Sequence, residues 1–159
     1  MSRLSLAPID GNVFQKAMGL RPEIMKAWFN LDEEIRFKGE LDPWLKEEVR
    51  RNLALGIGCE FCSSLGAPTP DKYDRKASLA VAFAQLVFDN IHDLRAIDDS
   101  AFAVLREEFS EPAIIELVCW SLFLVAAQGF GAIMKIRPAD STEVQEYKDW
   151  RAAGEAQAA

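Results

Sequence analysis

Residues 42–62 read DPWLKEEVRRNLALGIGCEFC, and this stretch holds both a clear helix start and a Cys-x-x-Cys pair. Asp42 is of a residue type that caps helices, and Pro43 suits a first helical position. Apolar residues then recur at helical spacing until two glycines weaken the helix just before Cys59. We therefore expect the chain to bend there and to place Cys59 near the N-terminus of a new helix.

The helical period continues through most of the 159 residues. No stretch alternates apolar and polar residues between turn signals, as a half-buried strand would. The predicted fold class is therefore all-α. The predicted helices are residues 13–18, closed by Gly19; a helix opened by Pro22 and stopped by Gly39; a helix from Pro43 to the glycines; a cysteine helix ended by residues 67–70; about 71–90, capped by Thr69; 101–109; and a long apolar helix opened by Ser110.

The chain carries 25 acidic against 18 basic residues, which gives a net charge of −7. Such a surface repels the phosphates of nucleic acids and the headgroups of anionic membranes, so we expect neither as a partner. Residues 1–10 lack the apolar stretch of a signal peptide, which predicts a cytoplasmic protein. Three cysteines, one of them remote from the pair, do not form a secreted disulfide framework.

Residues 117–134 carry no formal charge, and their length and apolar composition resemble those of a membrane-spanning helix. Ser121, Gln128 and two glycines interrupt the apolar run, and Glu116 borders it. We interpret it as a helix buried on all sides, in the core or in an oligomer interface, with Cys119 as a packed small side chain. A helix this apolar implies more buried surface than a small monomer supplies, so we expect a homo-oligomer.

The domain organisation is predicted to be simple. A chain of this length builds one hydrophobic core, which we expect within residues 1–138. Residues 139–159 are polar and alanine-rich and are predicted as a C-terminal tail in which Trp150 is the only large anchor.

Cys59 and Cys62 are the residues with the clearest chemistry. Two thiols three residues apart near a helix N-terminus can be oxidised and reduced reversibly, because one thiolate attacks a peroxide oxygen and the other resolves the sulfenic acid. The spacing leaves open which cysteine attacks. A zinc site lacks further ligands and a thioredoxin motif lacks its strand, whereas two packed core cysteines remain an alternative. No metal or cofactor motif is evident.

The run Leu45-Lys46-Glu47-Glu48-Val49, a glycine before the first cysteine, and Cys-Glu-Phe-Cys twelve residues beyond Glu47 form a pattern. It resembles the carboxymuconolactone decarboxylase and alkylhydroperoxidase-D (AhpD-like) superfamily over most of residues 13–136. The resemblance implies an all-helical, AhpD-like oligomer in which Glu47 is the carboxylate of a proton relay. That function requires burial to raise the pKa of Glu47.

Helix geometry alone points to Glu48 as the relay carboxylate. On a continuous helix, residues eleven positions apart lie on nearly the same face, which would bring Glu48 under Cys59. The peroxidases of this superfamily typically carry a histidine four residues after the second cysteine, where this chain has Gly66, and some carry one where it has Phe61. Ser63 or water is the candidate substitute in the relay. His92, the only histidine, lies in a polar connection, where we expect a solvated or capping side chain.

The resemblance and the cysteine pair together predict an antioxidant oxidoreductase of the alkylhydroperoxidase type. Its catalytic residues would be Cys59, Cys62 and Glu47, its substrate a hydroperoxide, and its reductant a thiol or dithiol. Two alternatives stay open. The first is an enzyme like the carboxymuconolactone decarboxylases, which process lactone acids without cysteines, and the second is a non-enzymatic helical oligomer whose cysteines are packed or sense oxidation.

Overall fold

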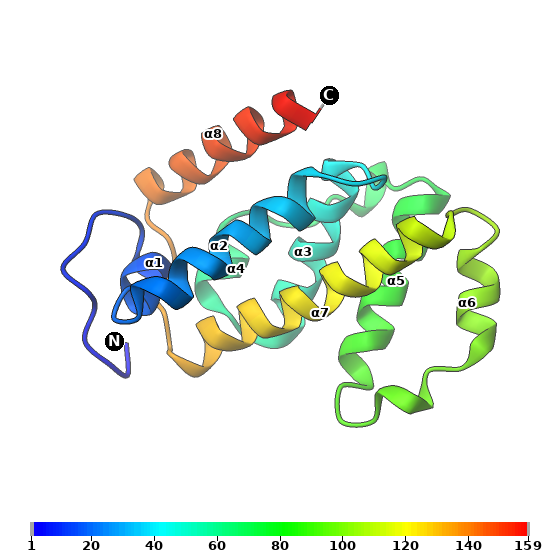
Figure 1. Ribbon diagram of the computed structural model, residues 1–159, viewed down its shortest axis with the longest axis horizontal. Helices are drawn as coiled ribbons and strands as arrows, with labels where there is room; N and C mark the ends of the chain where they lie inside the picture. Colours follow the sequence, from blue (N-terminus) through cyan, green and yellow to red (C-terminus); the bar gives the residue numbers. More distant parts are fainter. Residues whose placement is uncertain (1, 159) are drawn as a thin grey trace.

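The computed structural model describes residues 2–158, and the regular elements of this part of the chain are all helices, without a strand (Figure 1). The prediction of an all-α protein is confirmed. The helices are α1 (Val13–Met18), α2 (Pro22–Phe37), α3 (Pro43–Ile57), α4 (Glu60–Ser64), α5 (Arg75–Asp89), α6 (Asp99–Leu105), α7 (Glu111–Ile133) and α8 (Ser141–Ala158), with short 3₁₀ turns η1 (Pro70–Lys72) and η2 (Leu94–Ala96).

Two of the predicted caps are confirmed in atomic detail. The Asp42 side chain accepts a hydrogen bond from the Trp44 N–H at 2.7 Å, and Pro43 is the first residue of α3. The Ser110 hydroxyl accepts one from the Ala113 N–H at 3.2 Å and opens α7. Each cap satisfies a backbone donor that has no partner within the helix.

Helix α5, the first long helix after the cysteine helix, begins later than predicted. Thr69 opens only the turn η1, and its side chain makes no capping hydrogen bond. The Asp74 carboxylate instead accepts a hydrogen bond from the Ala77 N–H at 2.8 Å and starts α5. The prediction of a helix from about residue 71 is therefore wrong at this end, because Pro70 begins a tight turn and Asp74 provides the side-chain cap.

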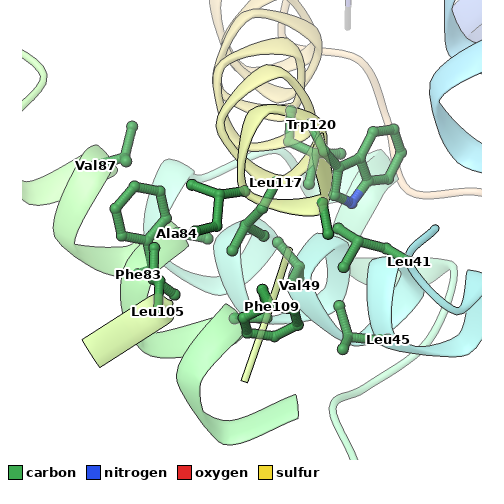
Figure 2. Close-up of a cluster of buried hydrophobic side chains, with 14 of the residues drawn as sticks. Leu41, Leu45, Val49, Phe83, Ala84, Val87, Leu105, Phe109, Leu117 and Trp120 are labelled. Atoms are coloured by element: carbon green, nitrogen blue, oxygen red, sulfur yellow. The ribbon is translucent and has the colours of Figure 1, made fainter. Parts of the chain in front are cut away.

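Helix α3 lies at the centre and packs against α2, α4, α5 and α7. Figure 2 shows the main core, in which side chains of α3, α5 and α7 meet. Val49 and Leu53 of α3 and Leu117 and Trp120 of α7 have no accessible surface. The Trp120 indole N–H donates to the Lys46 carbonyl at 2.9 Å, so this contact has both an apolar and a hydrogen-bonded component.

By length and composition alone, helix α7 is long and apolar enough to cross a membrane. However, 44% of an 18-residue apolar stretch of this helix is buried inside the structure. One face packs on α3 and α5, whereas Ile115, Leu122 and Ile133 are exposed on the other. Cys119 is also exposed. The prediction that α7 is buried on all sides does not hold within the chain, and the prediction of a packed Cys119 is wrong for the same reason.

The segment predicted as a tail forms α8, which lies beside α2 (Figure 1). The rings of Phe37 and Trp150 meet edge to face with centroids 5.0 Å apart. The Tyr147 hydroxyl donates to the Glu47 carboxylate of α3 at 2.6 Å. Helix α8 therefore contributes side chains to the region around the cysteine helix.

Candidate functional site

Cys59 and Cys62 form a disulfide at the start of α4, with their Cα atoms 5.2 Å apart. Gly58 ends α3 in the left-handed conformation (φ +81°), and Cys59 is the N-cap residue of α4. The Cys62 N–H donates to the Cys59 sulfur at 3.2 Å. The predicted break before Cys59 and the new helix start are thus confirmed.

A cavity of about 330 Å³ lies between α1, α2, α4, α7 and α8. Cys62 lines it, and Cys59 does not. Cys59 is 1% exposed and packs behind its partner, against Gly131 of α7 and the ring of Phe14. Of the two cysteines, the one that a molecule in the cavity can contact is therefore Cys62. The other walls are Asn12, Phe14, Gln15, Trp28, Phe29, Asp32, Glu33, Arg36, Arg50, Phe61, Leu65, Phe123, Leu124, Ala127, Gln128, Glu143, Glu146, Tyr147 and Trp150.

Glu47 is 1% exposed, and its carboxylate is surrounded by donors from three helices. We call Glu47 and these donors the Glu47 cluster. The donors are Arg50 Nε at 2.8 Å and Nη2 at 2.9 Å, Arg51 Nε at 2.9 Å, Arg151 Nη1 at 3.2 Å, Arg36 Nη1 at 3.4 Å and the Tyr147 hydroxyl at 2.6 Å.

The charges of this cluster decide the protonation state of Glu47. Burial alone raises the pKa of its carboxyl, but Arg50, Arg36 and the Tyr147 hydrogen bond outweigh burial and hold that pKa well below its usual range. The raised pKa that a proton relay through Glu47 requires is therefore not found. Glu47 is ionised at neutral pH, so the condition for a proton relay through this carboxyl is not met.

Arg50 connects the Glu47 cluster to the cysteine pair. Its Nη1 donates to the Cys62 carbonyl at 2.7 Å, while its other two nitrogens hold Glu47. The residue is 3% exposed and lines the cavity. Arg50 therefore ties the backbone of Cys62 to the Glu47 cluster, while its charge is paired with the Glu47 carboxylate.

The other candidate residues lie outside the cavity lining. Glu48 is fully buried and shares Arg51 with the Glu47 cluster; it accepts from Arg51 at 2.7 Å, the Thr69 N–H at 2.7 Å and the Tyr73 hydroxyl at 2.9 Å. It does not come under Cys59 because α3 ends at Gly58, where the continuous-helix geometry stops applying.

Ser63 and His92 are also placed away from the cavity. The Ser63 hydroxyl donates to the Glu60 carbonyl within its own helix turn, at 3.1 Å. His92 is exposed in the connection between α5 and η2, as expected for a solvated side chain. Neither residue is brought to Cys62 as a substitute for the missing histidines.

Gly66 stands where the resemblance would place a histidine, and its backbone has φ +146°, a conformation that side chains rarely adopt. A Cβ atom there would lie 3.2 Å from Arg51 Nε. The local chain is thus built for glycine, and an arginine of the Glu47 cluster occupies the adjacent space.

Comparison with known proteins adds no relative. No family model, curated protein or solved structure matches this chain. The AhpD-like resemblance therefore rests on the residues quoted from its sequence. Within residues 2–158, no group of three or more His, Cys, Asp or Glu side chains is arranged to hold a metal ion.

The polar residues of the cavity wall that sequence reasoning missed include Arg36, Arg50, Gln128 and Tyr147. One signal was available for Arg36. It follows Asp32 by four residues on the side of α2 that carries Trp28, and charged residues on an apolar helix face need partners. The two side chains pair at 2.9 Å. Tyr147 gave no such signal, since it lies 100 residues from Glu47.

Proposed function

We propose that this protein is a thiol-dependent hydroperoxide reductase, in which Cys62 reacts with the peroxide and Cys59 resolves the product. The observation that supports this most is the arrangement of the pair at the cavity, with Cys62 on the wall and Cys59 behind it. A substrate in the cavity would meet one sulfur, and the second lies within disulfide distance of the first.

The reaction would begin with the reduced pair. The Cys62 thiolate attacks the terminal oxygen of ROOH, so that an S–O bond forms, the O–O bond breaks, and the alkoxide leaves and takes a proton from water. The Cys59 thiolate then attacks the sulfenic sulfur of Cys62, and the departing hydroxide becomes water. The peroxide gains the two electrons that the pair loses in forming its disulfide.

A thiol or dithiol reductant would restore the pair by attacking the disulfide at Cys62, the sulfur nearer the cavity. Cys59 would leave as a thiolate, and the Cys62 N–H that donates to its sulfur at 3.2 Å stabilises that charge. Arg50, which binds the Cys62 carbonyl, would hold the Cys62 backbone in place during both steps. Both half-reactions then proceed without a carboxyl proton from Glu47.

The decarboxylase alternative requires a site for acidic substrates, and the charges at the cavity do not favour one. Its walls carry four carboxylates and two guanidinium groups, and both guanidinium groups are already paired with buried carboxylates. The carboxylates are Asp32, Glu33, Glu143 and Glu146, and the guanidinium groups are Arg36 and Arg50.

We also propose an AhpD-like homo-oligomer, located in the cytoplasm. The exposed side chains Ile115, Leu122 and Ile133 of α7 and Ile24 and Leu31 of α2 support the assembly, since α2 and α7 are neighbours. Light scattering during size exclusion should give a mass that is a multiple of 17.8 kDa. A mass of a single chain would reject the assembly.

The test of the enzymatic proposal is tert-butyl hydroperoxide consumption by pre-reduced protein, with free thiols counted before and after. We expect the wild type to lose two of its three thiols and Cys62→Ser to consume no peroxide. Cys119→Ser, which removes the exposed third cysteine, is the control and should behave like the wild type. Unchanged thiols without peroxide consumption would favour the non-enzymatic alternative, a helical oligomer whose cysteines are packed.

A further inference from the structure

Gln128 of α7 is a buried amide whose hydrogen bonding is incomplete. The residue is 2% exposed, and its Nε2 donates to the Arg50 carbonyl at 2.9 Å. That bond fixes the orientation of the amide, because only the nitrogen can face a carbonyl oxygen. The Oε1 is buried and accepts no hydrogen bond from any group of residues 2–158. Such an acceptor is costly unless a ligand or water satisfies it.

Gln128 lines the same cavity as Cys62, and it is held against the residue that binds the Cys62 carbonyl. Two other polar side chains of this wall, those of Asp32 and Tyr147, are engaged with protein partners. Asp32 accepts from Arg36 at 2.9 Å, and the Tyr147 hydroxyl is committed to Glu47. The amide oxygen is therefore suited to a ligand that brings its own donor.

We propose that Gln128 is a positioning residue whose Oε1 accepts the O–H of a neutral hydroperoxide and so aims its terminal oxygen at Cys62. The inference rests on the proposed function and adds a substrate requirement to it. The bound hydroperoxide keeps its proton during attack, the S–O bond forms at the oxygen that carries that proton, and the RO⁻ fragment leaves with the electrons of the O–O bond. The proton remains on the sulfenic acid, still facing Gln128.

This placement also favours one class of substrate. An amide oxygen selects for a hydrogen-bond donor, and the cavity wall has more carboxylates than guanidinium groups. The cavity walls also include the apolar side chains Phe61, Phe123 and Leu124. The fitting ligand is an uncharged organic hydroperoxide, whose apolar body contacts these side chains while its O–H reaches Gln128.

The test compares two reactions of the Cys62 thiolate in pre-reduced protein. One reagent carries a hydrogen-bond donor for Gln128 and the other does not. The first reagent is tert-butyl hydroperoxide, and the second is methyl methanethiosulfonate, which has no O–H or N–H group. Gln128→Met keeps the size of the side chain and removes the acceptor, together with the Nε2 donor that binds the Arg50 carbonyl; the thiosulfonate reaction detects any effect of losing that donor. We expect the rate constant for the peroxide to fall about tenfold, as the loss of one hydrogen bond would give, and that for the thiosulfonate to stay within about twofold.

The matched control is Asn52→Leu. Asn52 also donates from a side-chain amide to a backbone carbonyl of α3, that of Glu48 at 2.8 Å, and it does not line the cavity. Both of its rate constants should remain at the wild-type value. If Gln128→Met does not fold, Gln128→Asn can replace it. Its side chain is one methylene shorter, which moves the amide away from the ligand and should lower only the peroxide rate constant.

Two results would overturn the inference while leaving the proposed function intact. An unchanged peroxide rate constant would mean that Oε1 holds a water molecule only. Equal losses in both reactions would mean that Gln128 supports the cysteine helix rather than the substrate. A wild type whose thiols react with the thiosulfonate but not with the peroxide would instead reject the proposed function itself.

Discussion

Replacing Gly131 and Gly129 of α7 by alanine should change stability in opposite directions. A Cβ atom on Gly131 would collide with the sulfur of Cys59 and lie 3.4 Å from the ring of Phe14. That sulfur is fixed by its bond to Cys62 and is buried, so it cannot rotate away. A Cβ atom on Gly129 would meet nothing within 4 Å.

The magnitudes follow from packing and helix propensity. An added methyl group in a packed site costs about 1–3 kcal/mol, whereas alanine in place of glycine inside a helix gains about 0.5–1 kcal/mol. The oxidised protein should therefore lose about 1–2 kcal/mol of unfolding free energy in Gly131→Ala and gain about 0.5–1 kcal/mol in Gly129→Ala.

Urea unfolding at neutral pH measures both effects, provided that the slope of free energy against urea is the same in each variant. Repeating it with a reductant tests the cause, because a free Cys59 thiol can rotate and the cost in Gly131→Ala should shrink. Equal stabilities of the two oxidised variants would refute the packing of α7 against Cys59.

Further predictions concern the buried charges. Glu47→Gln should lower the unfolding free energy by about 3 kcal/mol, since it leaves buried arginines without their carboxylate, whereas the exposed Glu34→Gln should change it by less than about 1 kcal/mol in the same urea assay. The pKa of Glu47 in the folded protein lies below its ordinary value of 4.5, so the ionised carboxylate stabilises the fold fully above pH 4.5 and less as the pH falls below it. The unfolding free energy should therefore depend less on pH in the acid range in Glu47→Gln than in the wild type. The same pH dependence in both proteins would contradict this. Lys46→Met removes a fully buried ammonium that pairs with Glu116 and should cost about 3 kcal/mol, against little change for the exposed Lys38→Met, as measured by thermal unfolding.

The parts of the fold that depend on neighbouring residues could be predicted from the sequence. Asp42 and Ser110 cap helices through N–H groups two or three residues away, and Gly58 ends α3 by its own backbone conformation. The start of α5 was missed because Thr69 and Asp74 are both capping residue types and propensity alone does not rank them.

The parts that depend on distant contacts could not be predicted. The cysteine pair was identified from its spacing, but the preference for Cys62 requires knowing that α7 covers Cys59. The lowered pKa of Glu47 depends on Arg50 and also on Arg36 of α2 and Tyr147 of α8, and the sequence does not show that these two distant residues meet Glu47. The exposure of Cys119 likewise depends on which face of an almost uniformly apolar helix meets the core.

The assignment of the attacking sulfur is the central claim, and trapping of sulfenic acid tests it most directly. Pre-reduced Cys59→Ser and Cys62→Ser would each receive tert-butyl hydroperoxide with dimedone, followed by peptide mass spectrometry. The structure predicts a dimedone adduct on Cys62 in Cys59→Ser and little or none on Cys59 in Cys62→Ser, because only Cys62 lines the cavity. An adduct on Cys59 in Cys62→Ser, with an unmodified Cys62 in the other variant, would contradict the account.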